Sequence, residues 1–212
     1  MTAGGDGGGR PQATDELRPA GAGRCFGDGD PLYEAYHDDE WGFPVTDERG
    51  LFERLCLEGF QSGLAWITIL RKRPAFRDAF AGFEPDAVAR FDGEDVERLM
   101  GDAGIVRNRA KIEATIANAR ATVDLRDAGT PLSELIWAHR PDPRSAAKSL
   151  AELPAQLPEA ASLAKALKRV GFRFVGPTTV YAAMQACGLV NDHIATCPIR
   201  PRAEAAQAAL GG

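Results

Sequence analysis

The sequence has few cysteines, few histidines and no long apolar run, and each shortage excludes a class of protein. Four cysteines in 212 residues are too few for a disulfide-dense scaffold. The apolar stretches fall far short of the roughly 20 residues that a membrane-spanning helix needs, so we expect no membrane partner. A net charge of −5 argues against binding nucleic acid by charge alone, but it leaves room for one local basic patch.

The first part of the chain contains little that could form a core. Residues 1–24 are rich in glycine and hold a single leucine, so they cannot bury enough apolar area to offset the entropy of ordering. We therefore predict a disordered leader over 1–23. It lacks the apolar segment of a signal peptide, which favours an intracellular, cytoplasmic protein. In a reducing compartment, cysteines are thiols or metal ligands rather than disulfides.

The spacing of apolar residues from residue 24 onward predicts helices and no strands, which makes the fold all-α. One long helix is expected from about 47, capped by Thr46, to about 70, and Pro74 is expected to begin the next. Further helices are predicted at 85–91, 94–100, 111–125, 132–139, 162–170 and 178–187, with a connecting loop at 140–158. Residues 24–199 would form one domain of two helical lobes, and 200–212 a loose tail.

Two cysteines and two histidines lie near the two ends of this domain. Cys25 and His37 are at one end, and His193 and Cys197 are four residues apart at the other, on one face if that segment is helical. This Cys2His2 set suits one structural zinc ion, which would join the chain ends. Neither pair has the spacing of a zinc finger, so ordinary thiols and hydrogen-bonded histidines fit the pattern as well.

A glycine-containing turn joins the last two predicted helices. Gly176 followed by Pro177 fits a tight turn into a helix whose free N–H groups can hold a phosphate. Lys165, Lys168, Arg169 and Arg173 gather positive charge beside this turn. The layout is that of a helix-hairpin-helix grip on a DNA backbone, with Lys168, Arg169, Gly171, Gly176 and Thr178 as candidate contacts. An ordinary helix pair with basic, solvent-facing residues fits equally. The basic segment 104–111 is either a second backbone contact or a helix start.

Aromatic residues gather around one carboxylate candidate. Tyr33, Tyr36 and Trp41 lie in the segment that holds His37, and Trp66 follows in the long helix predicted over 47–70. In that same helix Glu58 lies at the edge of the apolar face, where a carboxylate needs a partner or has a function. An aromatic box with one anion suits a flat, cationic ligand such as an alkylated base. Core packing is the alternative for each aromatic residue taken singly.

Five segments of the sequence together resemble the DNA-3-methyladenine glycosylase I family. They are 25–42, 56–68, 102–105, 171–176 and 185–193, and the resemblance extends over about residues 24–197. It implies the all-α fold of the helix-hairpin-helix glycosylase superfamily and zinc on Cys25, His37, His193 and Cys197. It also implies a pocket for the damaged base formed by Glu58, Tyr33, Tyr36 and Trp66, with Trp41 nearby. One departure is Phe26, where family members often carry tryptophan.

The activity implied by the resemblance is release of 3-methyladenine from alkylated double-stranded DNA by a monomeric, monofunctional hydrolase of base-excision repair. Glu58 is the residue expected to act on the base. Asn191 stands where many superfamily relatives have an essential aspartate, which predicts a weaker catalyst that suffices for a charged leaving base. Asp192 is an alternative group to act on water. A zinc-stabilised protein that binds damaged DNA without catalysis is the competing function, whereas the signatures of deaminases and serine hydrolases are missing.

Overall fold

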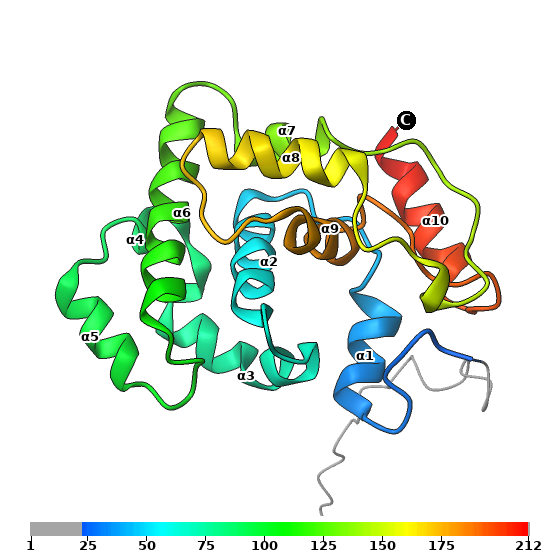
Figure 1. Cartoon of the computed structure of the whole chain (residues 1–212), viewed down its shortest axis with the longest axis horizontal. Coiled ribbons are helices and arrows are strands. Elements are labelled where there is room, and N and C mark those ends of the chain that lie inside the picture. The colour runs from blue at the N-terminus through cyan, green and yellow to red at the C-terminus, as the bar shows by residue number, and fades with distance from the viewer. Residues whose placement is uncertain (1–22, 212) are drawn as a thin grey trace, which may run out of the picture.

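The computed structural model describes residues 23–211 and contains helices and loops, with no strand over that range (Figure 1). The all-α prediction is therefore confirmed, while the predicted leader lies outside the described residues except at its last position. The helices are α1 (Pro31–Asp39), α2 (Glu48–Gln61), α3 (Trp66–Ala79), α4 (Pro85–Val88), α5 (Gly93–Gly101), α6 (Arg109–Asp127), α7 (Leu132–Trp137), α8 (Pro158–Arg169), α9 (Pro177–Ala186) and α10 (Arg200–Ala208). Short 3-10 turns are η1 (Ala81–Phe83), η2 (Leu150–Glu152) and η3 (Ala209–Gly211). Among residues 23–211, no helix is both long enough and apolar enough to cross a membrane.

Helix α2 lies at the centre of the molecule and packs against α3, α6, α7 and α9. Figure 1 shows α6 running beside it and α8 crossing above α9. Its buried residues include Phe52, Leu57 and Phe60, which are almost fully enclosed. Two glutamates of the same helix, Glu53 and Glu58, are buried as well. A helix enclosed on several sides fixes the position of whatever polar groups it carries.

The long helix predicted over 47–70 is wrong, because the chain turns between α2 and α3. Gly63 has a φ of +85°, a left-handed conformation that ends a helix at little cost for glycine. Lys111 donates from its Nζ to the carbonyl oxygens of Phe60 (2.9 Å) and Ser62 (2.7 Å), which satisfies the carbonyls at the end of α2. Trp66 therefore begins a different helix from the one that carries Glu58.

Pro74 lies inside α3 and does not begin a helix. Proline costs one intrahelical hydrogen bond inside a helix and none at its start, so its local preference is for the first turn. Buried side chains on both sides of it, Leu70 and Phe76, hold the helix against the core. Burial thus outweighs the local preference of a single residue.

The loose tail predicted over 200–212 is also wrong, because α10 and η3 form there. Pro201 occupies the first turn of α10, a position that suits proline. Ala203 is fully buried, and Gln207 donates from Nε2 to the carbonyl oxygen of Gly42 (2.9 Å). The buried face of α10 is made of alanine and glutamine, so the sequence there shows no strong pattern of large apolar residues. In Figure 1 this red helix lies on the same side of the molecule as α1.

Candidate functional site

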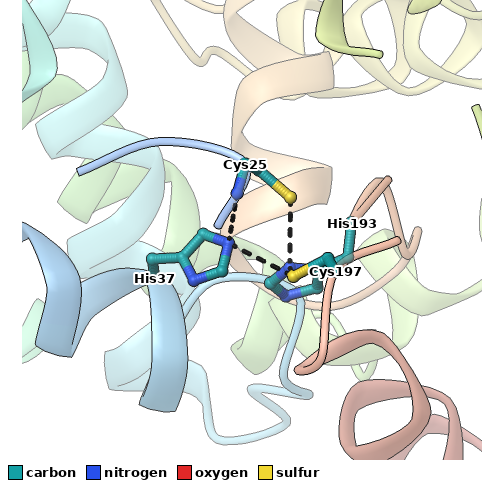
Figure 2. A group of neighbouring side chains, drawn as sticks. All are labelled: Cys25, His37, His193 and Cys197. Atoms are coloured by element: carbon teal, nitrogen blue, oxygen red, sulfur yellow. Dashed lines mark hydrogen bonds between the residues drawn. The ribbon is translucent and has the colours of Figure 1, made fainter. Parts of the chain in front are cut away.

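Four side chains from the two ends of the described chain meet in one cluster, shown in Figure 2. One potential ligand atom from each of Cys25, His37, His193 and Cys197 lies within 4.8 Å of all the others. The sulfur–nitrogen distances are 3.4 Å from Cys197 to His193, 3.6 Å from Cys197 to His37 and 3.6 Å from Cys25 to His193. In tetrahedral zinc sites with Zn–S of about 2.3 Å and Zn–N of about 2.0 Å, such edges measure about 3.5 Å. The donor set and its spacing therefore fit zinc.

Hydrogen bonds outside the cluster orient both imidazole rings. His37 Nδ1 lies 2.8 Å from a carboxylate oxygen of Asp38, and His193 Nε2 lies 2.9 Å from the carbonyl oxygen of Trp41. Because each acceptor takes the proton of the outer nitrogen, the inner nitrogen presents its lone pair to the cluster, where that of His37 also accepts from the Cys25 N–H (3.2 Å). The Ile194 N–H donates to the sulfur of Cys25 (3.3 Å), a contact that favours a thiolate.

The cluster shifts the pKa values of its two thiols in opposite directions, and that of Cys25 is raised overall by its hydrogen bond with Cys197 and by burial. A hydrogen bond from Cys25, assisted by His193 and His37, holds the pKa of the Cys197 thiol well below its usual range and outweighs the opposing effect of burial. A sulfur that carries negative charge between two imidazoles attracts a cation.

The segment that carries His193 and Cys197 is a loop, so the expected helical spacing is not the reason that the two side chains meet. Asn191 holds this loop in place. Its amide oxygen accepts from the His193 N–H (3.2 Å), and its Nδ2 donates to the carbonyl oxygen of Arg200 (3.1 Å). Asn191 also lines a cavity of about 260 Å³ that lies beside α10. Its observed contacts are those of a loop support, and they account for an amide at this position.

A second cavity, of about 270 Å³, lies between α1, α2, α3 and α9. We call it the base cavity. Its walls are formed by Phe26, Tyr33, Tyr36, Trp41, Glu58, Gln61, Trp66, Leu150, Leu153, Ala182 and Gln185. The structure thus brings together every residue proposed from the sequence for the base pocket, although they come from three separate segments of the chain.

Glu58 is the buried anion candidate of the base cavity, with 4% of its surface exposed. Burial raises the pKa of this carboxyl to about 8, and the charge of Arg54 opposes that rise. Arg54 lies one turn earlier on α2 and donates to Glu40 at 2.7 Å. Among the described residues, none donates a hydrogen bond to the Glu58 carboxyl group. A buried carboxyl group without a partner is costly unless a ligand supplies one.

Trp66 adds a second polar atom without a partner. Its Nε1–H is buried and has no acceptor among residues 23–211. The ring lies 5.3 Å from that of Tyr36, centre to centre, and Phe26 lies 4.9 Å from Tyr33. The base cavity therefore combines aromatic walls with one acid and one free donor, which suits a flat ring that carries both charge and polar edges.

Phe26, Gln61 and Gln185 are cavity residues that the sequence did not identify as site residues. Phe26 was noticed only as a departure from tryptophan, and its aromatic character was the signal for a pocket wall. Gln185 lies in a recognised segment, but its neighbours gave no reason to place it beside Glu58. Leu150 and Leu153 lie in the stretch predicted as a mere connecting loop, where no local pattern marks a cavity wall.

Asp192 does not line the base cavity, and both of its carboxylate oxygens are already engaged. Tyr181 and Gln185 donate to one oxygen (2.5 and 2.9 Å), and Arg144 donates to the other (2.7 Å). The side chain is buried. A carboxylate held in this way orients Gln185 and is poorly placed to take a proton from water.

The basic turn forms a hairpin between α8 and α9 over residues 170–176. Lys165, Lys168, Arg169 and Arg173 are all exposed, and within the described part of the chain none of them forms an ion pair. Gly176 precedes α9, and Thr178 lies exposed in its first turn, where backbone N–H groups lack helical acceptors. By contrast, the other basic segment begins α6 with Asn108 as its cap, and its Lys111 points inward.

Comparisons with known proteins agree with this architecture. A family model described as methyladenine glycosylase matches residues 26–201. The chain is 51% identical to DNA-3-methyladenine glycosylase 1 of Escherichia coli, over 81% of this chain and 93% of that protein. It is 42% identical to DNA-3-methyladenine glycosylase of Haemophilus influenzae, over 80% of this chain and 92% of that protein.

Solved structures show the same likeness. A crystal structure of 3-methyladenine DNA glycosylase I superposes with a TM-score of 0.81 at 50% identity, over 83% of this chain and 98% of that one. A 3-methyladenine DNA glycosylase I from Staphylococcus aureus, solved to explain recognition of 3-methyladenine, superposes with a TM-score of 0.79 at 37% identity, over 84% of this chain and 95% of that one.

Proposed function

The chain belongs to the methyladenine glycosylase family, and from that premise we propose that it is a monofunctional hydrolase of the N-glycosidic bond that joins 3-methyladenine to deoxyribose in alkylated double-stranded DNA. The observation that carries the proposal is the base cavity, where a buried carboxyl group without a partner stands among aromatic rings. Methylation at N3 gives adenine a positive charge. Such a base matches this cavity in charge, flatness and polar edge.

Glu58 has two tasks in this reaction. Its carboxylate attracts the cationic base once the base has left the duplex stack, and it accepts a hydrogen bond from the exocyclic amine of adenine. Arg54 nearby opposes the effect of burial, but the pKa of Glu58 stays at about 8, so below that pH the free chain keeps the carboxyl neutral and the arriving cation favours its ionised form. Trp66 and Tyr33 stack on the faces of the base, Tyr36 contacts its edge, and Trp41 closes the wall next to the metal cluster.

The charge of the leaving base supplies most of the drive for bond cleavage. A cationic base leaves more readily than a neutral one, so the enzyme needs little acid catalysis. Since both oxygens of Asp192 are engaged and Asn191 supports a loop, neither stands ready as a strong general base. This supports activity on the charged lesion and predicts poor activity on uracil or hypoxanthine.

The α8–α9 hairpin holds the DNA backbone in this proposal. The free N–H groups at the start of α9 and the side chain of Thr178 bind a phosphate, and Lys168 and Arg169 add positive charge. Gly171 and Gly176 let the backbone approach closely; Gly171 has a φ of +104°, where a side chain would be strained. We propose that one copy of the chain suffices for this grip.

We further propose that Cys25, His37, His193 and Cys197 hold one zinc ion. The support is the fit of their spacing to a tetrahedral site and the outer hydrogen bonds of both histidines. With four protein ligands, zinc supplies a structural cross-link between the chain ends and has no open position for water. The cluster therefore belongs to folding rather than to bond cleavage.

The test is a base-release assay on duplexes that each carry one lesion. We expect release of 3-methyladenine, little release of uracil, hypoxanthine or 7-methylguanine, and an abasic strand that stays intact until alkali is added. The guanine derivative is also cationic, but its oxygen would meet Glu58 with repulsion. Binding of the lesion without base release would support a non-catalytic damage binder instead.

A further inference from the structure

Helix α6 does not line the base cavity, yet its side chains hold two loops. One lies at the rim of the cavity, and the other is the α8–α9 hairpin. The first is the turn over 62–65 between α2 and α3. Lys111, 9% exposed, reaches from the first turn of α6 and donates to the carbonyl oxygens of Phe60 and Ser62. Gln61 and Trp66, which bracket this turn, both line the base cavity. The ammonium group thus fixes the rim of the cavity from outside.

The second loop is the α8–α9 hairpin, and Asn118 holds it by a pair of hydrogen bonds. The Arg173 N–H donates to the amide oxygen of Asn118 (2.7 Å), and Asn118 Nδ2 donates to the carbonyl oxygen of Arg173 (3.2 Å). The next residue, Phe174, has a φ of +56° and an exposed side chain. A bulky residue in this conformation is uncommon and persists only where the surroundings impose it. Asn118 supplies that constraint.

The two anchors share one face of α6. Lys111 and Asn118 are seven residues apart, or two turns, which places them about 10 Å apart along the helix axis. A rigid helix with two fixed points on one face sets the distance between the loops that it holds. On the other side the hairpin packs on α2, because a Cβ placed on Gly59 would lie 3.5 Å from the Cβ of Phe174. Glu58 is the neighbour of that glycine.

We propose that Lys111 and Asn118 are positioning residues of the glycosylase, which set from α6 the spacing between the rim of the base cavity and the hairpin that grips the backbone. The inference rests on the proposed function. A base leaves the stack while its own backbone is held, so the hairpin and the cavity must match the span between a phosphate and an extruded base. A shift of the hairpin breaks that match while the cavity itself stays intact. A shift of the 62–65 turn breaks it by moving the cavity rim at Gln61 and Trp66.

The experiment compares Lys111→Met and Asn118→Leu with the wild-type chain. We expect kcat/KM for release of 3-methyladenine from a duplex to fall by about 100-fold, the loss that a misplacement of about 1 Å causes. Affinity for the free base should stay near the wild-type value in Asn118→Leu, whereas Lys111→Met, which releases the cavity rim, should lose part of it. Thr115→Val and Thr122→Val are matched controls, since their buried hydroxyls donate to carbonyl oxygens within α6 (3.0 and 2.8 Å), and Thr115 also contacts the Cys56 thiol of α2. Both controls should keep wild-type release.

Conservative variants and the double variant separate positioning from simple loss of stability. Lys111→Arg keeps a donor for the two carbonyls, and Asn118→Asp keeps the acceptor for the Arg173 N–H, so both should recover part of the activity. Stability losses at this separation add. Losses in release should not add, because one misplaced loop already breaks the match. Additive losses in release, loss of free-base affinity in Asn118→Leu, or wild-type release by folded single variants would each overturn the positioning role. A wild-type chain that releases no base would overturn the proposed function itself.

Discussion

The cluster of Cys25, His37, His193 and Cys197 and the base cavity are two groups of buried side chains that both use α1, and they differ in how their polar atoms are partnered. In the cluster, every ring nitrogen and every sulfur has a neighbour within hydrogen-bond or ligand distance. In the cavity, Glu58 and the Trp66 Nε1–H have none within the described chain. A cluster whose polar atoms all have neighbours is suited to hold a fold, whereas a cavity with unmatched groups is suited to receive a ligand.

The two regions are joined through α1 and Trp41. Helix α1 carries His37 into the cluster and Tyr36 into the wall of the cavity. The Trp41 ring stacks near His37 (6.1 Å between ring centres), meets His193 edge-on at 4.7 Å and also lines the cavity. Because α1 and Trp41 belong to both regions, a displacement of the cluster side chains also displaces the cavity wall. Damage to the cluster should reach the cavity, while damage to Glu58 should leave the cluster alone.

The largest effect should come from breaking the cluster. Cys197→Ser should abolish zinc binding, lower the free energy of unfolding by several kcal/mol and weaken base release, because in our proposal the zinc ion links both ends of the domain. Metal analysis and urea unfolding measure this. Cys187→Ala is the matched control, a buried thiol outside the cluster, and it should keep the metal. Full zinc content and unchanged stability in Cys197→Ser would contradict the structural role.

The next effect is confined to the cavity. Glu58→Gln keeps the shape of the side chain and removes its charge, so affinity for the cationic base should fall by about 2 kcal/mol, or about 30-fold. Zinc content and binding to undamaged duplex should not change. The control is Glu53→Gln, which removes a second buried glutamate of α2 that pairs with Arg77 (2.8 Å). If both variants lose base affinity equally, the charge of Glu58 is not what recognises the base.

The pH dependence of stability sharpens the same contrast. Burial raises the pKa of Glu58 from its ordinary value of 4.5 to about 8. Between these values the folded chain keeps a proton that the unfolded chain has lost, so this group makes the free energy of unfolding fall as pH rises from about 4.5 to about 8. Urea unfolding at pH 5 and pH 8 measures the fall, and Glu58→Gln should reduce it. Equal falls in wild type and variant would show that Glu58 contributes none of it.

Much of this contrast could be predicted from the sequence, because the residues of each site lie in distinctive segments. The cluster ligands and the aromatic residues around Glu58 were identified from residue type and from the family resemblance. The helices with clear caps or a glycine stop were also predicted, such as α5 after Asp92, whose side chain accepts from two N–H groups of the first turn. Local chemistry and tertiary structure agree at these positions.

The errors arise where distant contacts decide the local structure. The end of α2 depends on Lys111, about fifty residues away in sequence, and α10 is held by Gln207 bonding to Gly42 at the other end of the chain. Neither contact leaves a pattern in its own neighbourhood. The same holds for Gln185, which reaches the cavity wall through the tertiary packing of α9. The periodicity of apolar residues predicts which face of a helix is buried. It does not predict which distant polar group will bond to that helix or to its end.

The smallest effect concerns the hairpin, which lies outside both regions and should act on DNA alone. Each phosphate contact adds about 0.9 to the slope of log affinity against log salt, so a local grip predicts a slope of about 3 or less. Replacing Lys168 and Arg169 together with alanine should lower that slope by up to about 2 and leave zinc content and free-base affinity unchanged. Arg109→Ala is the matched control, because this exposed guanidinium already pairs with Glu97 (2.8 Å) and belongs to the other basic segment. Titration of a duplex at several salt concentrations decides the matter: a wild-type slope near 8, or an equal drop in Arg109→Ala, would show that the DNA surface extends well beyond the hairpin.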